Sequence, residues 1–123
     1  MNRPDALLGD EHGEVLPPVA GTTQLLQALG DPVRMELVRA LAGAAGPITC
    51  GAFQVPVTKS TLTHHFRVLR EAGVIETRCL GTRKLISLRR PDVDQAYPGL
   101  LASLLRAPAE PVLDAGWAAA SSR

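Results

Sequence analysis

A change of hydrophobic period at Gly73 restricts the folds that this sequence can adopt. Before this glycine, apolar residues recur every three or four positions, as on one buried helix face: Leu62, Phe66, Leu69 and Ala72. After it, VIETRCL and RKLISLR alternate with the two-residue period of strands, and the Gly81-Thr82 pair between them suits a type II′ hairpin turn. The sequence therefore predicts a helix over residues 59–72 that runs directly into a two-stranded hairpin.

Two further helices are predicted upstream of this unit. The first is indicated by an apolar rhythm that begins near Thr22 and ends at Gly30, which suits a position just after a helix: Leu25, Leu26 and Leu29. Asp31 is a candidate N-cap of the second helix and Pro32 its first residue, and four apolar residues share its inner face: Val33, Leu37, Val38 and Leu41. Arg34 falls in the first turn, where the helix dipole favours acids, so we expect an acidic side chain or a phosphate beside it.

The remaining segments complete a recognisable order. ITCGAFQVPVT has room only for a short helix, with Thr49 as candidate N-cap, and a leucine stripe predicts a last helix: Leu100, Leu101, Leu104 and Leu105. Pro98 can only start or kink that helix, which leaves residues 92–97 as a separate turn. The predicted fold is mainly α with a β-hairpin wing (α+β), a winged helix-turn-helix. We divide the chain into a flexible N-terminal arm (1–20), one domain (21–106) and a C-terminal tail (107–123), in which Trp117 is the residue able to dock.

Positive charge is concentrated in one block of the chain. Residues 59–90 carry eight basic and two acidic residues, a net charge of +6, whereas the whole 123-residue chain carries +1. A one-sided basic block indicates a polyanionic partner. Aromatic residues, which single-stranded nucleic acids need for stacking, make up only 3%, so duplex DNA is favoured. Without a long apolar run or a signal-peptide pattern, the sequence predicts a cytoplasmic protein with no membrane partner.

Two motifs resemble the ArsR-type winged-helix transcriptional repressors. LQALGDPVRMELVRAL resembles the signature helix of that family, and KSTLTHHFRVLREAGVIETRCLGTRKLISL looks like its recognition helix and wing. The resemblance covers residues 22–106. It implies a homodimer, formed by the first and last helices, that binds an inverted-repeat operator and blocks transcription until an inducer is sensed. Metal-sensing members usually carry two cysteines one residue apart before the recognition helix, whereas TCGAF has Cys50 alone, so no metal or other cofactor is predicted.

The polar face of the predicted recognition helix is the candidate DNA-binding surface. His64 and His65 are adjacent, but consecutive helical residues point about 100° apart and cannot easily close on one ion. We place His64 on the exposed side and His65 partly packed, with a hydrogen bond to the preceding loop as one option. The helix contacts predicted for the major groove or the phosphates are Lys59, Ser60, Thr63, His64 and Arg67. The wing contacts predicted for the flanking groove are Thr82, Arg83 and Lys84.

Two other sets of residues have open interpretations. The leucines of the first and last helices either form an isologous dimer interface or pack inside the monomer, and both can hold: Leu25, Leu26, Leu29, Leu100, Leu101, Leu104 and Leu105. Cys50 and Cys79 are either candidate thiol sensors or two small buried hydrophobic residues.

The sequence as a whole predicts a dimeric DNA-binding transcription regulator and not an enzyme, because no acid, base and nucleophile converge. We expect a repressor that binds an inverted-repeat operator and is released by an unidentified inducer or signal. The alternative is a winged-helix protein-interaction module that does not bind DNA. The two hypotheses differ in the salt dependence of binding, because affinity for duplex DNA must fall steeply as the salt concentration rises if the chain binds DNA.

Overall fold

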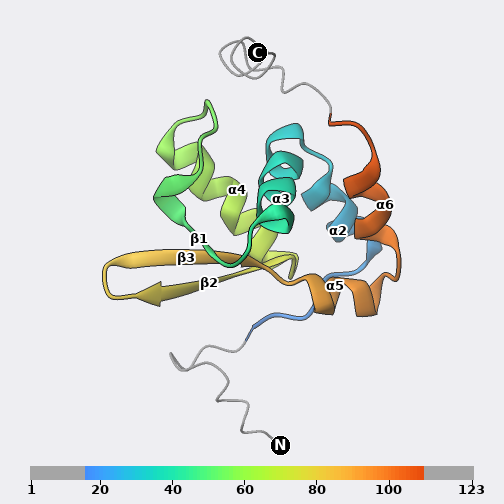
Figure 1. Ribbon diagram of the computed structural model, residues 1–123. Coiled ribbons are helices and arrows are strands. Elements are labelled where there is room, and N and C mark those ends of the chain that lie inside the picture. The colour runs from blue at the N-terminus through green and yellow to red at the C-terminus, as the bar shows by residue number, and fades with distance from the viewer. Residues whose placement is uncertain (1–15, 110–123) are drawn as a thin grey trace, which may run out of the picture.

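The computed structural model describes residues 16–109 of the chain. Its elements follow in this order: α2 (Thr22–Leu29), α3 (Pro32–Gly43), β1 (Ile48–Thr49), the 3-10 helix η1 (Cys50–Ala52), α4 (Lys59–Glu71), β2 (Ile75–Leu80), β3 (Arg83–Leu88), α5 (Arg90–Ala96) and α6 (Leu100–Arg106). This order confirms the predicted α+β winged helix-turn-helix. Figure 1 shows the β2–β3 hairpin reaching away from the helices, with α2 and α6 on the opposite side of the molecule.

The junction between α2 and α3 is built by three consecutive residues. The Asp31 carboxylate accepts hydrogen bonds from the backbone N–H groups of Val33 at 2.9 Å and Arg34 at 3.0 Å, and Pro32 is the first helical residue, as predicted. Gly30 does not adopt the left-handed conformation common after a helix, since its φ is −86°. A Cβ at this position would instead lie 2.9 Å from the carbonyl oxygen of Leu26, so close packing favours glycine here.

The end of α4 depends on Gly73 for two separate reasons. Its φ of +80° is left-handed, and the N–H groups of Gly73 and Val74 donate to the carbonyls of Arg70 and Leu69, which satisfies the last turn of the helix. A Cβ on Gly73 would also lie 2.6 Å from the Pro18 carbonyl oxygen. This glycine therefore lets the chain turn from α4 into the wing while the N-terminal segment packs against it.

The wing is a regular antiparallel hairpin with an additional short strand. Strands β2 and β3 pair from Ile75 opposite Leu88 to Leu80 opposite Arg83, and positive φ occurs at Gly81 but not at Thr82, as in the predicted type II′ turn. Strand β1, which was not predicted, pairs antiparallel with β3 and makes a sheet of order β1-β3-β2. The helix predicted after Thr49 is correspondingly reduced to three 3-10 residues without a side-chain cap. Pairing with β3 supplies hydrogen-bond partners for this backbone that a single turn of helix would not.

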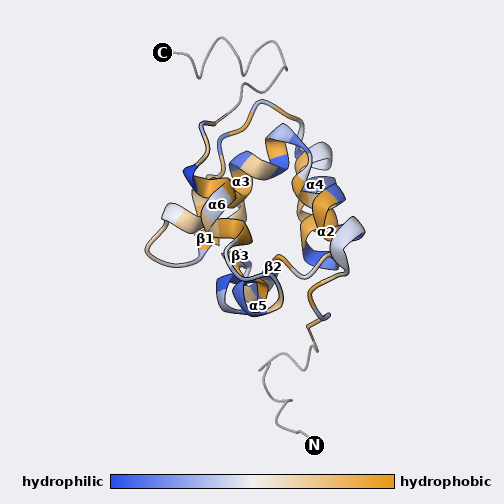
Figure 2. Ribbon diagram, turned by 90° about the vertical axis from the view of Figure 1, so that its right-hand side faces the viewer, coloured by the Kyte–Doolittle hydropathy of each residue, from blue (hydrophilic) through white to orange (hydrophobic). Residues whose placement is uncertain are grey.

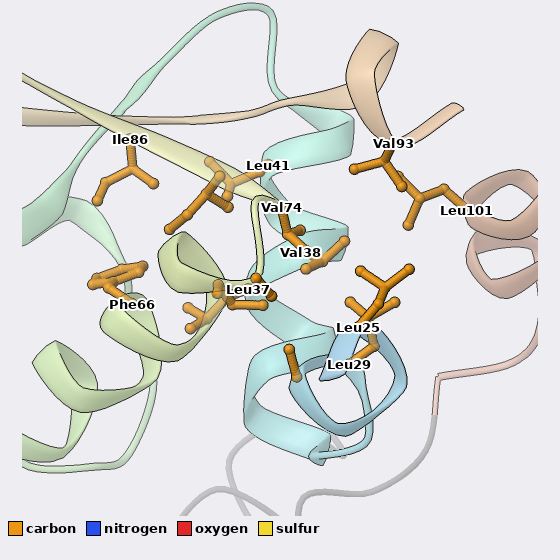
Figure 3. Packing of buried hydrophobic residues seen from close by; sticks show 14 of the residues in the cluster. Leu25, Leu29, Leu37, Val38, Leu41, Phe66, Val74, Ile86, Val93 and Leu101 are labelled. Atoms are coloured by element: carbon orange, nitrogen blue, oxygen red, sulfur yellow. The ribbon is translucent and has the colours of Figure 1, made fainter. Parts of the chain in front are cut away.

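One hydrophobic cluster joins every helix of the described chain to the sheet. Its buried members are Leu25, Ala28, Leu29, Val33, Leu37, Val38, Leu41, Phe66, Leu69, Ala72, Val74, Ile75, Ile86, Val93 and Leu101. Figure 3 shows Val93 of α5 and Leu101 of α6 at the same end of this cluster as Leu25 of α2. Helix α5 is otherwise largely hydrophilic (Figure 2), and it occupies the place where a separate turn was predicted.

Residues 17–20 belong to the domain, although the sequence places them in a flexible arm. The Arg89 guanidinium donates to the Pro17 carbonyl at 2.6 Å, and the Tyr97 hydroxyl donates to the Ala20 carbonyl at 2.7 Å. The Ala20 N–H donates to Ala72 at 2.9 Å. These contacts move the predicted domain boundary at residue 21 towards the N-terminus. The rest of the arm and most of the tail, with Trp117, lie outside the described residues. Within 16–109, no helix is both long and apolar enough to cross a membrane.

Candidate nucleic-acid interface

The N-terminal turn of α4 is organised by hydroxyl groups. The Thr58 Oγ1 accepts the backbone N–H of Thr61 at 3.2 Å and donates to Thr61 Oγ1 at 2.9 Å. The Ser60 hydroxyl lies 3.3 Å from the same Thr58 oxygen, and all three side chains are exposed. This cap leaves Lys59 and Ser60 at the surface, at the helix end whose dipole attracts anions such as phosphate.

The outer face of α4 is continuous, polar and exposed. Every helix residue predicted to contact DNA is exposed on it: Lys59, Ser60, Thr63, His64 and Arg67. On the inner face, Phe66 and Leu69 are buried and Leu62 is half-buried, and the Phe66 ring packs edge-to-face on Phe53 with 5.1 Å between centroids. The only acidic residue of α4 is Glu71 at its last position. The helix therefore presents hydroxyl, imidazole and cationic groups without a nearby carboxylate on its own first turns.

The two adjacent histidines have different environments. His64 is exposed, and its Nδ1 lies 3.1 Å from a guanidinium nitrogen of Arg67. His65 is only 8% exposed, and its Nδ1 lies 3.0 Å from Nη1 of Arg34 in α3. Because a guanidinium only donates, both Nδ1 atoms act as acceptors. The hydrogen-bond partner of His65 is thus on a neighbouring helix, which corrects the option of a bond to the preceding loop.

Arg34 is stabilised in a way that the sequence did not predict. Its Nε donates to the Ala28 carbonyl at 2.7 Å, and its Nη2 donates to the Gln27 carbonyl at 3.2 Å. Both carbonyls belong to the last turn of α2, where unpaired oxygens carry the negative end of the helix dipole. These carbonyls are the partners of the Arg34 guanidinium, while the Asp31 carboxylate accepts the backbone N–H of Arg34.

Burial is the main cause that lowers the pKa of His65 below its ordinary value of 6.5. The Asp31 carboxylate acts in the opposite direction and raises this pKa, whereas the positive charge of Arg34 and the His64 ring lower it further. A lowered pKa keeps the ring neutral at neutral pH. That protonation state agrees with a hydrogen bond in which Nδ1 accepts.

The wing residues predicted to contact DNA lie at the tip of the hairpin. Thr82, Arg83 and Lys84 are all exposed. In the register of the hairpin, Arg83 lies opposite Leu80 and Lys84 lies opposite Cys79. Because successive side chains of a strand point to opposite faces, Arg83 and Lys84 leave the hairpin on different sides. A duplex lying along one face of the wing therefore meets one of these cations directly. Leu80 is 56% exposed and shares a face with Arg83.

The two cysteines are free thiols in different settings. Cys50 is half-buried and directly follows β1, whereas Cys79 is exposed in β2. Strand β3 lies between these two strands. Adjacent strands are about 4.8 Å apart, so backbones on either side of β3 are separated by about 10 Å. This exceeds the Cα separation of up to about 7 Å that a disulfide bridges. Among the residues from 16 to 109, no three His, Cys, Asp or Glu side chains form a group that could hold a metal ion.

The leucines predicted at a dimer interface divide into two groups. Leu25, Leu29 and Leu101 are buried in the core of the single chain, with at most 4% of each residue exposed. Leu26 is 49% exposed and lines a groove of about 600 Å³ between α2 and the turn before α6, together with Tyr97 and Leu100. The remaining two, Leu104 and Leu105, are half-buried against the core. The interface stays a prediction, and its accessible part is reduced to four leucines.

Sequence reasoning missed that two arginines of α3 bind the ends of other helices. Arg34 reaches the end of α2, and Arg39 donates to the carbonyls of Leu105 at 3.2 Å and Leu104 at 3.4 Å at the end of α6. The unfavourable position of Arg34 in a first helical turn was a signal that it had a special partner. No comparable signal exists for Arg39, because its partners are backbone atoms far away in the sequence.

Comparison with known proteins matches the segment that contains α3, α4 and the start of the wing. The family described as a helix-turn-helix domain matches residues 29–78, from the last residue of α2 into β2. The uncharacterized HTH-type transcriptional regulator YceK of Bacillus subtilis is 34% identical over 83 residues, which span 66% of this chain and 83% of that protein. The uncharacterized HTH-type transcriptional regulator MJ1325 of Methanocaldococcus jannaschii is 28% identical over 60 residues, 48% of this chain and 67% of that protein.

Proposed function

Because the chain belongs to the helix-turn-helix family of DNA-binding transcription regulators, we propose that it is a repressor that binds an operator as a homodimer. The observation that carries this proposal is the exposed polar face of α4, which the Thr58 cap begins and the buried Phe66 and Leu69 support. The resemblance of two sequence motifs to ArsR-type repressors supports the same function. We propose that the repressor leaves the operator when it binds an inducer or when the thiol of Cys50 or Cys79 reacts.

Helix α4 enters the major groove in this proposal. Its N-terminal turn, with Lys59 and Ser60, approaches phosphates and base edges, as the first turns of recognition helices do in helix-turn-helix proteins. Thr63 and His64 follow one turn later on the same exposed face. The hairpin extends beside the helix bundle (Figure 1), so Thr82 and either Arg83 or Lys84 reach the flanking minor groove.

The groove beside Leu26 is the proposed centre of the dimer. Its lining residues come from α2 and from the segment between α5 and α6, and α2 and α6 lie away from the hairpin tip (Figure 1). A second copy that buries Leu26 and Leu100 across a two-fold axis would carry its own α4 and wing. Two recognition helices related in this way fit half-sites about 34 Å apart, which is one turn of DNA and the geometry of an inverted repeat.

The test of DNA binding is the salt dependence of duplex affinity for the full chain and two single variants. Lys59→Ala should weaken binding and reduce the slope of log K against log salt by about 1, because one phosphate contact is lost. His64→Ala should weaken binding on the selected operator more than on random duplex. Both variants should keep the thermal stability of the wild type, because both side chains are exposed.

Arg106→Ala supplies the matched control for this experiment. It removes one exposed basic side chain at the end of α6, on the other side of the molecule from the hairpin tip. Its affinity and salt slope should equal those of the wild type. Equal affinities for Lys59→Ala, His64→Ala and the wild type would contradict the assigned surface. Wild-type binding that does not weaken with salt would instead favour a protein-interaction module.

A further inference from the structure

We propose that Arg34 and His65 hold the recognition helix in its DNA-binding position, and that protonation of the His65 ring releases it. Affinity for duplex DNA then falls in mild acid. The inference rests on the proposed function, because it assigns to that function two positioning residues that do not touch DNA. Its basis is one guanidinium that hydrogen-bonds to two helices at once.

The guanidinium of Arg34 joins α2 to α4. Its Nε and Nη2 bind the carbonyls of Ala28 and Gln27 at 2.7 and 3.2 Å, and its Nη1 binds His65 Nδ1 at 3.0 Å. Arg34 itself starts α3, where its backbone N–H donates to the Asp31 carboxylate. The planar group is thus held by two hydrogen bonds to α2 besides its bond to His65, which leaves it little freedom to follow the ring if the ring moves.

The bond to His65 depends on the protonation state of the ring. A guanidinium remains protonated at any pH that proteins tolerate, so Arg34 can only donate. His65 Nδ1 can accept only in the neutral tautomer that carries its proton on Nε2. A second proton taken from solvent converts Nδ1 into a donor and places a positive ring against a positive guanidinium. The hydrogen bond is then replaced by repulsion within a site where the ring is only 8% exposed.

The charged groups around His65 determine how easily it takes up that proton. Asp31, the N-cap of α3, favours the protonated ring, whereas Arg34 and His64 oppose it. Helix α2 carries no charged side chain in its sequence TTQLLQAL and contributes only carbonyl oxygens. The Asp31 carboxylate already accepts two backbone N–H groups. Protonation of His65 is therefore opposed first by burial of the ring and then by the contact with Arg34.

Displacement of His65 bears directly on the DNA-binding surface. His64 is its neighbour in α4, with 5.8 Å between the two ring centroids. Because helical residues are held in a fixed relation, a rotation of α4 that moves the His65 ring away from Arg34 also moves the exposed residues of its outer face. Protonation of the exposed His64 has the opposite consequence, since added positive charge strengthens attraction to phosphates. Affinity for DNA should thus fall in acid when His65 takes up a proton and rise when His64 does.

The experiment measures affinity for a duplex that the purified full chain selects from genomic fragments, at about pH 7.5 and about pH 5.5. Wild-type affinity should fall about tenfold at the lower pH, the size expected for loss of one hydrogen bond to a charged group. His65→Asn should retain its affinity at both pH values, because the amide oxygen can accept from Arg34 and the side chain does not titrate. His64→Asn removes the opposing contribution of the exposed ring, so its loss of affinity in acid should be at least as large as that of the wild type.

Arg34→Ala provides a second and independent test. Without the guanidinium, affinity at about pH 7.5 should already be as low as that of the wild type in acid, and its pH dependence should disappear. Far-UV circular dichroism at both pH values establishes that each protein remains folded. A wild type and a His65→Asn variant with the same pH profile would overturn the proton link while leaving the proposed function intact. Absence of duplex binding at both pH values would contradict the proposed function itself.

Discussion

The two sides of this small domain differ in the side chains that they expose. On the wing side, α4 and the hairpin expose hydroxyl, imidazole and cationic groups that are supported from behind by the core. The α2–α6 side carries an apolar groove beside Leu26, among exposed polar residues of α2 and α6, and we call it the apolar side after this groove. Arg34 connects the two, since it binds the end of α2 and the inner face of α4. One α3 arginine, and not the hydrophobic core alone, therefore connects the proposed DNA-binding side to the proposed dimer side.

The largest expected effect is a loss of stability when a buried leucine of the apolar side is replaced. Leu101→Ala should lower the free energy of unfolding by about 2–5 kcal/mol, because Leu101 is fully buried and its removal leaves a cavity. Leu26→Ala should change it by only about 0.5 kcal/mol or less, because Leu26 is half exposed. Urea unfolding of both variants at a protein concentration that keeps the chain monomeric measures the difference. Equal destabilisation would mean that Leu26 also belongs to the core.

The next effect concerns whether the apolar side binds a second copy. Leu26→Glu should weaken the proposed dimer by about tenfold to a hundredfold, since it replaces a leucine whose burial contributes about 1.5–3 kcal/mol with a charge. Sedimentation equilibrium against the wild type gives the dissociation constants. Leu80→Glu is the matched control, because Leu80 is exposed to a similar degree but lies on the wing. If both variants associate like the wild type, the groove is not the interface.

A smaller effect should distinguish two glycines of the wing side. Both have left-handed φ values, +80° at Gly73 and +65° at Gly81. Substitution of Gly81 by alanine should cost about 1–2 kcal/mol from backbone strain alone, because nothing lies within 4 Å of the added Cβ. The same change at Gly73 should cost more, since the Cβ would meet the Pro18 carbonyl at 2.6 Å. Thermal unfolding of the two variants gives the order, and the reverse order would contradict the packing of residues 17–20 on α4.

The wing side could be predicted well from sequence because its signals are local. Helical period alone separates Phe66 and Leu69 from the exposed Thr63 and Arg67, and this separation is what the structure has. The Asp31 cap and the hairpin turn at Gly81 follow from residue types whose backbone preferences are strong.

The apolar side could not be resolved in the same way, because a leucine on a helical stripe suits a core and an interface equally. Leu25 and Leu26 are adjacent in sequence, yet Leu25 is fully buried and Leu26 is 49% exposed. Strand β1 has two residues, too few to show a period, and its existence depends on pairing with Ile86 and Leu85 far along the chain. The partners of Arg34 were missed for the same reason, since they are backbone oxygens brought near by folding.

The smallest expected effect concerns stability against pH and tests the link between the two sides. His65 has a lowered pKa in the folded state, mainly through burial, so in acid the unfolded chain binds a proton before the folded chain does. The contribution of the neutral His65 ring to the free energy of unfolding is therefore complete above pH 6.5. It decreases as the pH falls below 6.5 and stops decreasing once the pH is below the lowered pKa of the folded state. Urea unfolding at a series of pH values should show this decrease for the wild type and a shallower one for His65→Asn, which retains an acceptor for Arg34. Identical pH dependence in the two proteins would mean that His65 binds its proton equally in both states, and that the bond to Arg34 does not favour the neutral ring.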